Sequence, residues 1–545
     1  MRLPPALKLF PLAASLLAAL PALAAVRLPA VLSEHMVLQR GAATPVWGWA
    51  EPGETVEVRY GEASAGGVAG GSTAAGSAAA GSRAAGSATA SSAVAAGTAA
   101  RNAAAGNAAA GNAAARNAAA GNAAAGSVTT QTRAGADGRW RTVLDLRDAP
   151  RAGTLEVRGA TNTVTAGDVL LGDVWLASGQ SNMQKPLGER KGERPTFDAP
   201  AEIAAAEAPD LRLFKVQRGK ASAPQEDVAG QWVRCSPESI ESSQFSAVGY
   251  FFGRRLQREL GVPLGLIDSS VGGTRIELWT PASALSQAGR AEMDSSALYN
   301  AMVAGLAPFA LKGMLWYQGE SNVLVTDDGA TYTAKMAALV GAWRTAFGTQ
   351  FPRQLPFYYV QIAPHLYHVL RHHQVLDAEA VPRLQEAQSA ALRIPGTGMV
   401  VTTDLVDDLT DLHPRDKKSV GYRLANLALN ETYGRKDIEA YGPVYRSLQV
   451  RDGRAVVTFD HGAGLFSANG KALTWFDVAG ADGKWHPAGA VVERDRVIVT
   501  SPKVPRPKKV RFAWDEAAQP NLVNGAGLPA RPFRSDHPLP PQARR

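Results

Sequence analysis

Residues 169–177 and the turn Ser178-Gly179-Gln180-Ser181 constrain the fold of this chain more than any other stretch. The run is mostly apolar and rich in β-branched residues, which is typical of a strand buried on both faces of a parallel sheet. It ends in a turn of small residues. A serine there can lie at the carboxyl edge of the sheet, where open α/β folds bind ligands and backbone N–H groups can stabilise an oxyanion. On this stretch alone, an ordinary turn whose serine caps a helix is an equally good interpretation.

Strand-like and helical segments alternate from this strand to about residue 429, which favours an α/β fold with a parallel sheet. We expect a helix over 248–260 and strands over 262–267, 312–317 and 356–362. Short alternating segments stand on either side, as in 45–49 and 497–500. The chain therefore predicts a β-domain before the α/β domain and a second, smaller one after it.

A tract of Ala, Gly, Ser and Asn at 62–127 interrupts the first β-domain. Much of it repeats Ala-Ala-Ala-Gly-Asn, in which glycine and asparagine oppose helix formation and large apolar groups are scarce. We expect a disordered insertion in an exposed hairpin. The predicted organisation is a leader at 1–25, a β-domain at 26–165 containing this insertion, an α/β domain at 166–435 and a β-domain at 436–545.

The first 25 residues are typical of a secretory signal peptide. Arg2 and Lys8 precede an apolar run, and Ala22-Leu23-Ala24 forms an A-x-A cleavage site. The run is too short to span a bilayer and no later stretch is long and apolar enough, so we expect export to the periplasm or the medium without membrane insertion.

Cysteine content argues against a disulfide-stabilised protein, and the charge distribution argues against a nucleic-acid-binding protein. Cys235 is the one cysteine, so no intramolecular disulfide can form, and no histidine motif accompanies it to suggest catalysis. The formal net charge of +8 is spread along the chain and gathers only near residues 503–509. This pattern indicates a solvated face, not a nucleic-acid site.

Three loops follow predicted strands and could meet Ser181. One contains Gly272-Gly273, whose backbone can approach a ligand closely and donate N–H groups. The second, at 316–322, contains Gln318 and Asn322 as possible oxyanion donors and Ser321 as a rival nucleophile. The third, at 404–414, places several aspartates before His413. A base oriented by an acid is what an activated serine needs, although His413 alone could be an ordinary surface histidine.

A separate cluster of His365, His368, His372 and His373 could present imidazoles on one helical face. No carboxylate or cysteine stands at ligand spacing, so the cluster favours a loop or a surface helix over a metal site.

Four motifs, in this order, resemble the sialate O-acetylesterase family of SGNH hydrolases. They are 179–183 (GQSNM), 272–277 (GGTRIE) with Trp279, 316–322 (WYQGESN), and 412–414 (LHP) with Lys417 and 421–425 (GYRLA). Residues 36–40 and 521–530 also resemble the β-domains of the family. The resemblance covers nearly the whole chain after the leader, except the Ala/Gly tract.

The resemblance implies a flavodoxin-like SGNH core at 166–435 and removal of O-acetyl groups from carbohydrates without a metal or another cofactor. Ser181 would be the nucleophile and His413 the base. The oxyanion donors would be the Ser181 N–H, Gly272 or Gly273, and Gln318 or Asn322. Many SGNH enzymes carry an aspartate three residues before the histidine, but Thr410 stands there. Asp411 is therefore the favoured acid, with Asp408 and Asp404 as fallbacks.

The substrate stays open at this point. Sialic acid, acetylated xylan and other acetylated glycans all fit the family resemblance. Arg275 could meet a carboxylate such as that of sialic acid or pair with Glu277, and Trp279 is a further candidate substrate contact. An α/β-hydrolase is disfavoured, because neither serine motif has the closing glycine of Gly-x-Ser-x-Gly. A non-catalytic carbohydrate-binding protein is the alternative from another class.

Overall fold

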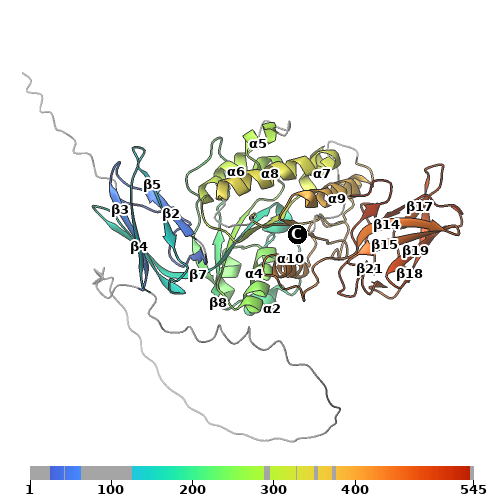
Figure 1. Cartoon of the computed structure of the whole chain (residues 1–545), viewed down its shortest axis with the longest axis horizontal. Coiled ribbons are helices and arrows are strands. Elements are labelled where there is room, and N and C mark those ends of the chain that lie inside the picture. The colour runs from blue at the N-terminus through green and yellow to red at the C-terminus, as the bar shows by residue number, and fades with distance from the viewer. Residues whose placement is uncertain are drawn as a thin grey trace, which may run out of the picture.

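The computed structural model describes residues 25–41, 43–62, 126–287, 295–326, 328–348, 354–370 and 376–539. The expected signal peptide and the expected Ala/Gly-rich insertion lie almost entirely outside these residues. The described part is elongated, with a central α/β unit between two β-rich ends (Figure 1). The domain boundaries given above stay predictions.

A mostly parallel sheet forms the centre, in the strand order β13-β12-β11-β7-β10-β8-β9. Neighbouring strands from β13 to β8 run parallel, whereas β9 pairs antiparallel with β8 at the edge. The α/β expectation is thus confirmed, with a sheet that is mixed and not purely parallel. The strands are β7 (Thr163–Gly179), β8 (Ala208–Lys215), β9 (Trp232–Cys235), β10 (Leu264–Ser270), β11 (Gly313–Tyr317), β12 (Phe357–Val360) and β13 (Thr397–Val400).

Helices cover both faces of this sheet (Figure 1). The helix expected at 248–260 is α4 (Ala247–Leu260), which begins where the Ser246 side chain accepts the Gly249 N–H and ends at Gly261 in the left-handed conformation. One face carries α2 (Ala199–Ala204), α4 and α10 (Lys417–Glu431). The other carries α5 (Ala282–Gln287), α6 (Ala297–Met302), α7 (Glu320–Thr326), α8 (Tyr332–Phe347) and α9 (Ala380–Ala390).

The N-terminal strands join the central sheet through β7. This strand is 17 residues long; its first part pairs with β6 and β1, and its second part lies between β10 and β11. Strands β3 and β4 flank the Ala/Gly tract and pair with each other, Tyr60 opposite Val128, so the chain leaves and re-enters the sheet at one place. The N-terminal strands are β1 (Val37–Gln39), β2 (Ala43–Trp49), β3 (Thr55–Gly61), β4 (Val128–Arg133), β5 (Arg139–Asp145) and β6 (Ala152–Arg158).

The C-terminal region is an antiparallel sheet in the order β14-β15-β19-β18-β17-β20-β22, as alternating patterns in this part of the sequence predict. Its own buried cluster includes Phe476, Val478 and Phe512. The strands are β14 (Val444–Arg451), β15 (Arg454–Asp460), β17 (Phe476–Ala479), β18 (Trp485–Glu493), β19 (Arg496–Thr500), β20 (Lys509–Phe512) and β22 (Phe533–Arg534), with β16 (Phe466–Ser467) and β21 (Leu522–Val523) as a separate pair. Over the described ranges, no helix has the length and apolarity needed to cross a membrane.

Candidate active site

The predicted nucleophile lies directly after the central strand β7. Gly179, the last residue of β7, has φ 136°, and a Cβ there would lie 2.2 Å from the carbonyl oxygen of Tyr317 on the neighbouring strand β11. Only glycine allows this approach. Ser181 then opens the short helix α1 (Ser181–Gln184) at the carboxyl edge of the sheet and is partly exposed. Its backbone N–H occupies a first-turn position, which has no intrahelical acceptor.

Asn182 ties the Ser181 turn to the loop that carries His413. Its Nδ2 donates to Oε1 of Glu320 at 2.5 Å and to the carbonyl oxygen of Leu412 at 3.1 Å. Its Oδ1 accepts from Nζ of Lys417 at 2.6 Å. Leu412 precedes His413, so the fully buried amide of Asn182 joins the residue after Ser181 to the residue before His413. Within the described chain, Ser181 and His413 themselves form no direct hydrogen bond.

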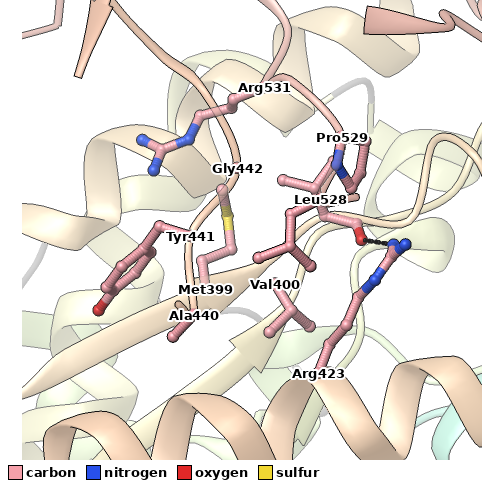
Figure 2. A pocket seen from close by; sticks show the side chains of 10 residues that line it. Met399, Val400, Arg423, Ala440, Tyr441, Gly442, Leu528, Pro529 and Arg531 are labelled. Atoms are coloured by element: carbon pink, nitrogen blue, oxygen red, sulfur yellow. Dashed lines mark hydrogen bonds between the residues drawn. The ribbon is translucent and has the colours of Figure 1, made fainter. Parts of the chain in front are cut away.

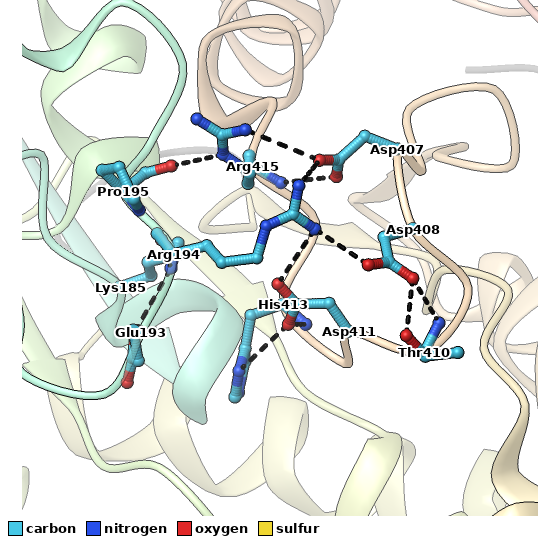
Figure 3. A network of polar contacts seen from close by, with 10 residues as sticks. All are labelled: Lys185, Glu193, Arg194, Pro195, Asp407, Asp408, Thr410, Asp411, His413 and Arg415. Atoms are coloured by element: carbon cyan, nitrogen blue, oxygen red, sulfur yellow. Dashed lines mark hydrogen bonds and ion pairs between the residues drawn. The ribbon is translucent and has the colours of Figure 1, made fainter.

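Asp411 is the candidate acid closest to the imidazole of His413. Its Oδ1 lies 3.9 Å from Nδ1 of His413 and accepts the backbone N–H of His413 at 2.9 Å (Figure 3). The 3.9 Å separation is an ion-pair distance, longer than a hydrogen bond. Of the two ring nitrogens, Nδ1 is thus the one paired with the carboxylate.

The two fallback aspartates have other partners. Asp408 accepts from Thr410 and pairs with Arg194 at 3.2 Å, and Asp404 is bound by Arg423. Arg194 also reaches Asp407 at 2.8 Å and Asp411 at 3.7 Å, so one arginine fastens three aspartates of the loop to the segment after α1 (Figure 3).

The surroundings of His413 keep its imidazole neutral. Burial, and then the positive charge of Lys417, lower the pKa of His413 to about 4; Lys185 adds to the effect, while Glu193 and Asp411 oppose it. A neutral imidazole can accept a proton, so His413 is in the form that a general base requires over nearly the whole physiological range.

Lys417 and Glu320 are ionisable groups with almost no contact to solvent. Lys417 is fully buried, and burial followed by repulsion from Lys185 lowers its pKa to about 7. Burial also raises the pKa of Glu320, whose Oε2 has no hydrogen-bond partner in the described structure. Asn182 lies between these two groups and contacts both. Sequence reasoning assigned no role to Asn182, Lys417 or Arg194.

Of the two candidate glycines, Gly272 is the one that lies beside Ser181. A Cβ on Gly272 would lie 3.2 Å from Cβ of Ser181, whereas Gly273 is exposed and has φ 73°. The N–H of Gly272 donates to Oε1 of Gln184 at 2.9 Å. The Gly272 N–H therefore has Gln184 as its acceptor in this structure.

Gln318 and Asn322 use their amide hydrogens inside the protein, which does not support the expectation that they donate to an oxyanion. Both are fully buried. Nε2 of Gln318 donates to Oδ1 of Asn322, Oε1 of Gln180 and the carbonyl of Thr274. Nδ2 of Asn322 donates to Glu277 and Asp328.

The two residues expected to contact the substrate, Trp279 and Arg275, differ in their exposure to solvent. Trp279 is fully buried and donates to Thr274 at 3.0 Å, so the structure corrects its assignment: it is a core residue. Arg275 is partly exposed at the start of the 3₁₀ helix η1 (Ile276–Trp279). Glu277, its candidate partner, is buried and pairs with Lys335. The rival nucleophile Ser321 is also buried.

No cluster of metal-binding side chains occurs among the described residues. His368 contacts Glu516, and His365 is buried with neither ring nitrogen hydrogen-bonded. His372 and His373 lie outside the described residues. Cys235 is buried in the core, and burial raises the pKa of its thiol to about 12, which leaves it unreactive.

A serine at the carboxyl end of a central parallel strand, with a histidine and an aspartate from one late loop, defines the class of serine hydrolases. Comparison with known proteins narrows this class. The family model for carbohydrate esterases, sialic acid-specific acetylesterase, matches residues 171–430. The chain is 33% identical to human sialate O-acetylesterase over 361 residues, 59% of this chain and 65% of that one. It is 30% identical to the mouse protein over 417 residues, 64% and 74% of the two chains.

A solved structure extends the similarity to nearly the whole chain. The crystal structure of a carbohydrate acetylesterase from Xanthomonas citri superposes with a TM-score of 0.73 at 32% identity, covering 93% of this chain and 99% of that one. The chain belongs to the sialate O-acetylesterase family of carbohydrate esterases. Its match spans 65% of the length of the primate relatives.

Proposed function

We propose that this protein is a serine esterase that removes O-acetyl groups from carbohydrates through an acetyl-enzyme. The observation that carries the proposal is the set of hydrogen bonds from Asn182 to Glu320, Leu412 and Lys417, which we call the Asn182 clamp. It joins the Ser181 turn to the His413 loop at the carboxyl edge of the sheet. The family and the carbohydrate acetylesterase with the same architecture support the reaction class. They also support the SGNH type of core.

In the proposed mechanism, Nε2 of His413 takes the hydroxyl proton of Ser181 as Oγ attacks the acetyl carbonyl. The Ser181 and Gly272 N–H groups stabilise the oxyanion, with Gln184 turning away from Gly272. One such donor contributes roughly 3–4 kcal/mol in studied enzymes. The sugar oxygen leaves with the proton from His413. Water, deprotonated by His413, then releases acetate and restores Ser181. Asp411 orients His413 and stabilises its charged form.

For the substrate, we infer an O-acetylated sialic acid, in line with the description of the matched family. Acetylated xylan and other acetylated glycans are the alternatives. Arg275 remains a proposed contact for a sugar carboxylate. We also propose export through cleavage of the leader, because the first 25 residues carry a signal-peptide pattern.

The test is acetate release by the purified protein from O-acetylated sialic acid and acetylated xylan, side by side, with Ser181→Ala as the control. We expect release that falls by about 10⁴-fold or more in Ser181→Ala while the melting temperature stays unchanged. The preferred panel member names the substrate class. A folded wild-type protein that binds these glycans and releases no acetate would be a carbohydrate-binding protein instead.

A further inference from the structure

A large cavity separates the C-terminal sheet from the central unit. It has a volume of about 540 Å³ and is lined by the end of α9, by Arg393, and by residues of β14, β15 and the segment at 531–539. Ligand sites of small molecules typically have this size and often lie between such units. Arg393 lies just before β13, at the amino edge of the parallel sheet, whereas Ser181 follows the carboxyl end of β7. The cavity is therefore not part of the proposed active site.

Positive charge exceeds negative charge in this cavity. Its two carboxylates already have arginine partners: Glu386 accepts two hydrogen bonds from Arg534, at 3.0 and 3.2 Å, and Asp460 lies 3.7 Å from Arg446. Two further arginines, Arg393 and Arg531, line the cavity as well. Neither has an ion pair within the described residues.

Among the arginines that line the cavity, Arg531 is the one with a buried nitrogen that lacks a hydrogen-bond acceptor in the described structure. Its backbone is fixed, because its N–H donates to the carbonyl of Pro443 at 3.0 Å. Its Nε is buried and forms no hydrogen bond in the described structure. Burial lowers the pKa of Arg531, opposed only by Tyr359 and Tyr441. A buried guanidinium N–H without an acceptor is costly, and a ligand oxygen in the cavity would remove this cost.

The direction of Arg531 agrees with a ligand site. Its guanidinium is turned away from Leu528 and Pro529 and extends past Gly442 (Figure 2). On the Leu528 side, only a gap of about 20 Å³ remains, enough for about one water molecule. The larger cavity on which Arg531 also borders can hold a sugar unit.

Aromatic side chains complete the wall of the cavity. Tyr445 and Phe533 both line it and stack on each other, with ring centroids 4.6 Å apart and planes at 20°. Aromatic walls with a few placed polar groups are typical of sites for small organic ligands. A planar guanidinium matches a carboxylate through two parallel hydrogen bonds.

We propose that this cavity, which we call the Arg531 cavity, is a second, non-catalytic site that binds an acidic sugar through its carboxylate. Arg531 receives the carboxylate, Arg393 adds a second positive charge, and the sugar ring packs near Tyr445 and Phe533. The choice of a sugar as ligand rests on the proposed function. A sialic acid and a uronic acid share the required carboxylate. Such a site would hold an acidic glycan while Ser181 acts on an acetyl group elsewhere on it.

The test uses the full chain carrying Ser181→Ala, titrated in a calorimeter with N-acetylneuraminic acid, glucuronic acid, glucose and acetate. We expect saturable binding of one or both acidic sugars and none of glucose or acetate. Loss of a charge-assisted hydrogen-bond pair predicts that Arg531→Gln weakens binding by about tenfold or more. Arg454→Gln, on an exposed position of β15, is the matched control and should bind as before.

A second variant and an esterase assay separate loss of the sugar site from misfolding and from loss of the esterase. If Arg531→Gln does not fold, the exposed Arg393→Gln takes its place, with a smaller expected loss. In the Ser181 background, both variants should hydrolyse 4-nitrophenyl acetate at the wild-type rate. Acidic-sugar binding that survives both substitutions, equal binding of acetate, or no binding would overturn the Arg531 cavity and leave the esterase standing. A folded wild type without ester hydrolysis would overturn the esterase alone.

Discussion

Two polar clusters lie side by side in this fold, where Gln318 contacts Gln180, the residue before Ser181. They differ in whether their hydrogen-bonding groups are all used inside the protein. One, which we call the catalytic corner because it holds the proposed nucleophile, acid and base, comprises Ser181, Asn182, Asp411, His413 and Lys417. The other, the amide network, comprises Gln318, Asn322, Glu277, Asp328 and Lys335. Both are rich in amides and charges. The network closes on itself: every amide hydrogen of Gln318 and Asn322 has an internal acceptor. The corner leaves Ser181 and His413 partly exposed.

The difference teaches that polar density does not mark a reaction centre. What marks it is a group whose hydrogen-bonding capacity is left for a substrate. We therefore expect substitutions in the catalytic corner to reduce the rate and largely spare stability, and substitutions in the amide network to do the reverse. The following tests are ordered by the size of the expected effect.

Replacing the acid of the catalytic corner should have the largest of these effects. Asp411→Asn removes the charge that stabilises protonated His413, and we expect kcat to fall by about 10³-fold with little change in melting temperature. Acetate release under saturating substrate measures it. Asp408→Asn is the matched control, since Asp408 pairs with Arg194 and Thr410, and should stay within about threefold of wild type. A large loss in Asp408→Asn alone would move the acid to Asp408.

In the amide network, Asn322→Ala should destabilise the protein. It leaves Glu277, Asp328 and Gln318 short of a buried partner, which costs about 2–4 kcal/mol in the free energy of unfolding. Denaturant unfolding measures this loss, and kcat below the transition should stay near wild type. A stable Asn322→Ala protein with a greatly reduced kcat would break the comparison and return Asn322 to the oxyanion site.

In the catalytic corner, Asn182→Ala tests whether the Asn182 clamp positions the reacting groups. Without the amide, the Leu412 carbonyl and Lys417 lose their contact with the Ser181 turn, and misplacement of reacting groups by about 1 Å can cost roughly 10²-fold in rate. We expect a fall of that order in kcat. The ratio of rate loss to stability loss should exceed that of Asn322→Ala, and equal ratios would contradict the separate roles.

The pH dependence of kcat/KM gives the smallest and most specific effect. Because the pKa of His413 is about 4, the acidic limb of the profile should lie well below the usual histidine value. Lys417→Met removes a positive charge that disfavours protonation of His413, so the limb should move toward higher pH by about one unit. A limb near the usual histidine value in wild type, or one that Lys417→Met leaves in place, would contradict this electrostatic role.

The sequence is sufficient to predict the α/β core, because strands such as β10 and β11 end where their apolar runs meet polar turns. It also identifies the turn at Ser181 and the loop at His413. It cannot reveal which way Gln318 and Asn322 point. Their acceptors, Thr274 and Glu277, come from a loop more than forty residues earlier, and only tertiary packing brings them together.

The same limit applies to Trp279 and to the Arg531 cavity. A tryptophan next to a polar motif looks like a sugar platform, yet Trp279 packs edge-on against Trp316 at 6.2 Å in the core. Whether Arg531 has a carboxylate partner is decided by segments far from it in the sequence, so the sequence alone does not show that it has none. Both features follow from packing between segments far apart in the chain.

Strand β7 runs from the N-terminal sheet to Ser181; after a bulge at Gly167 and Asp168, its second part pairs with β10 and β11 in unbroken register. Inserting one residue after Asp173, where this register is continuous, would advance Ser181 by about 3.3 Å and reverse the facing of every later side chain in the strand. Between β3 and β4, by contrast, dozens of residues separate two paired strands without changing their register. Insertions between β3 and β4 should therefore disturb the fold far less than insertions in the second part of β7.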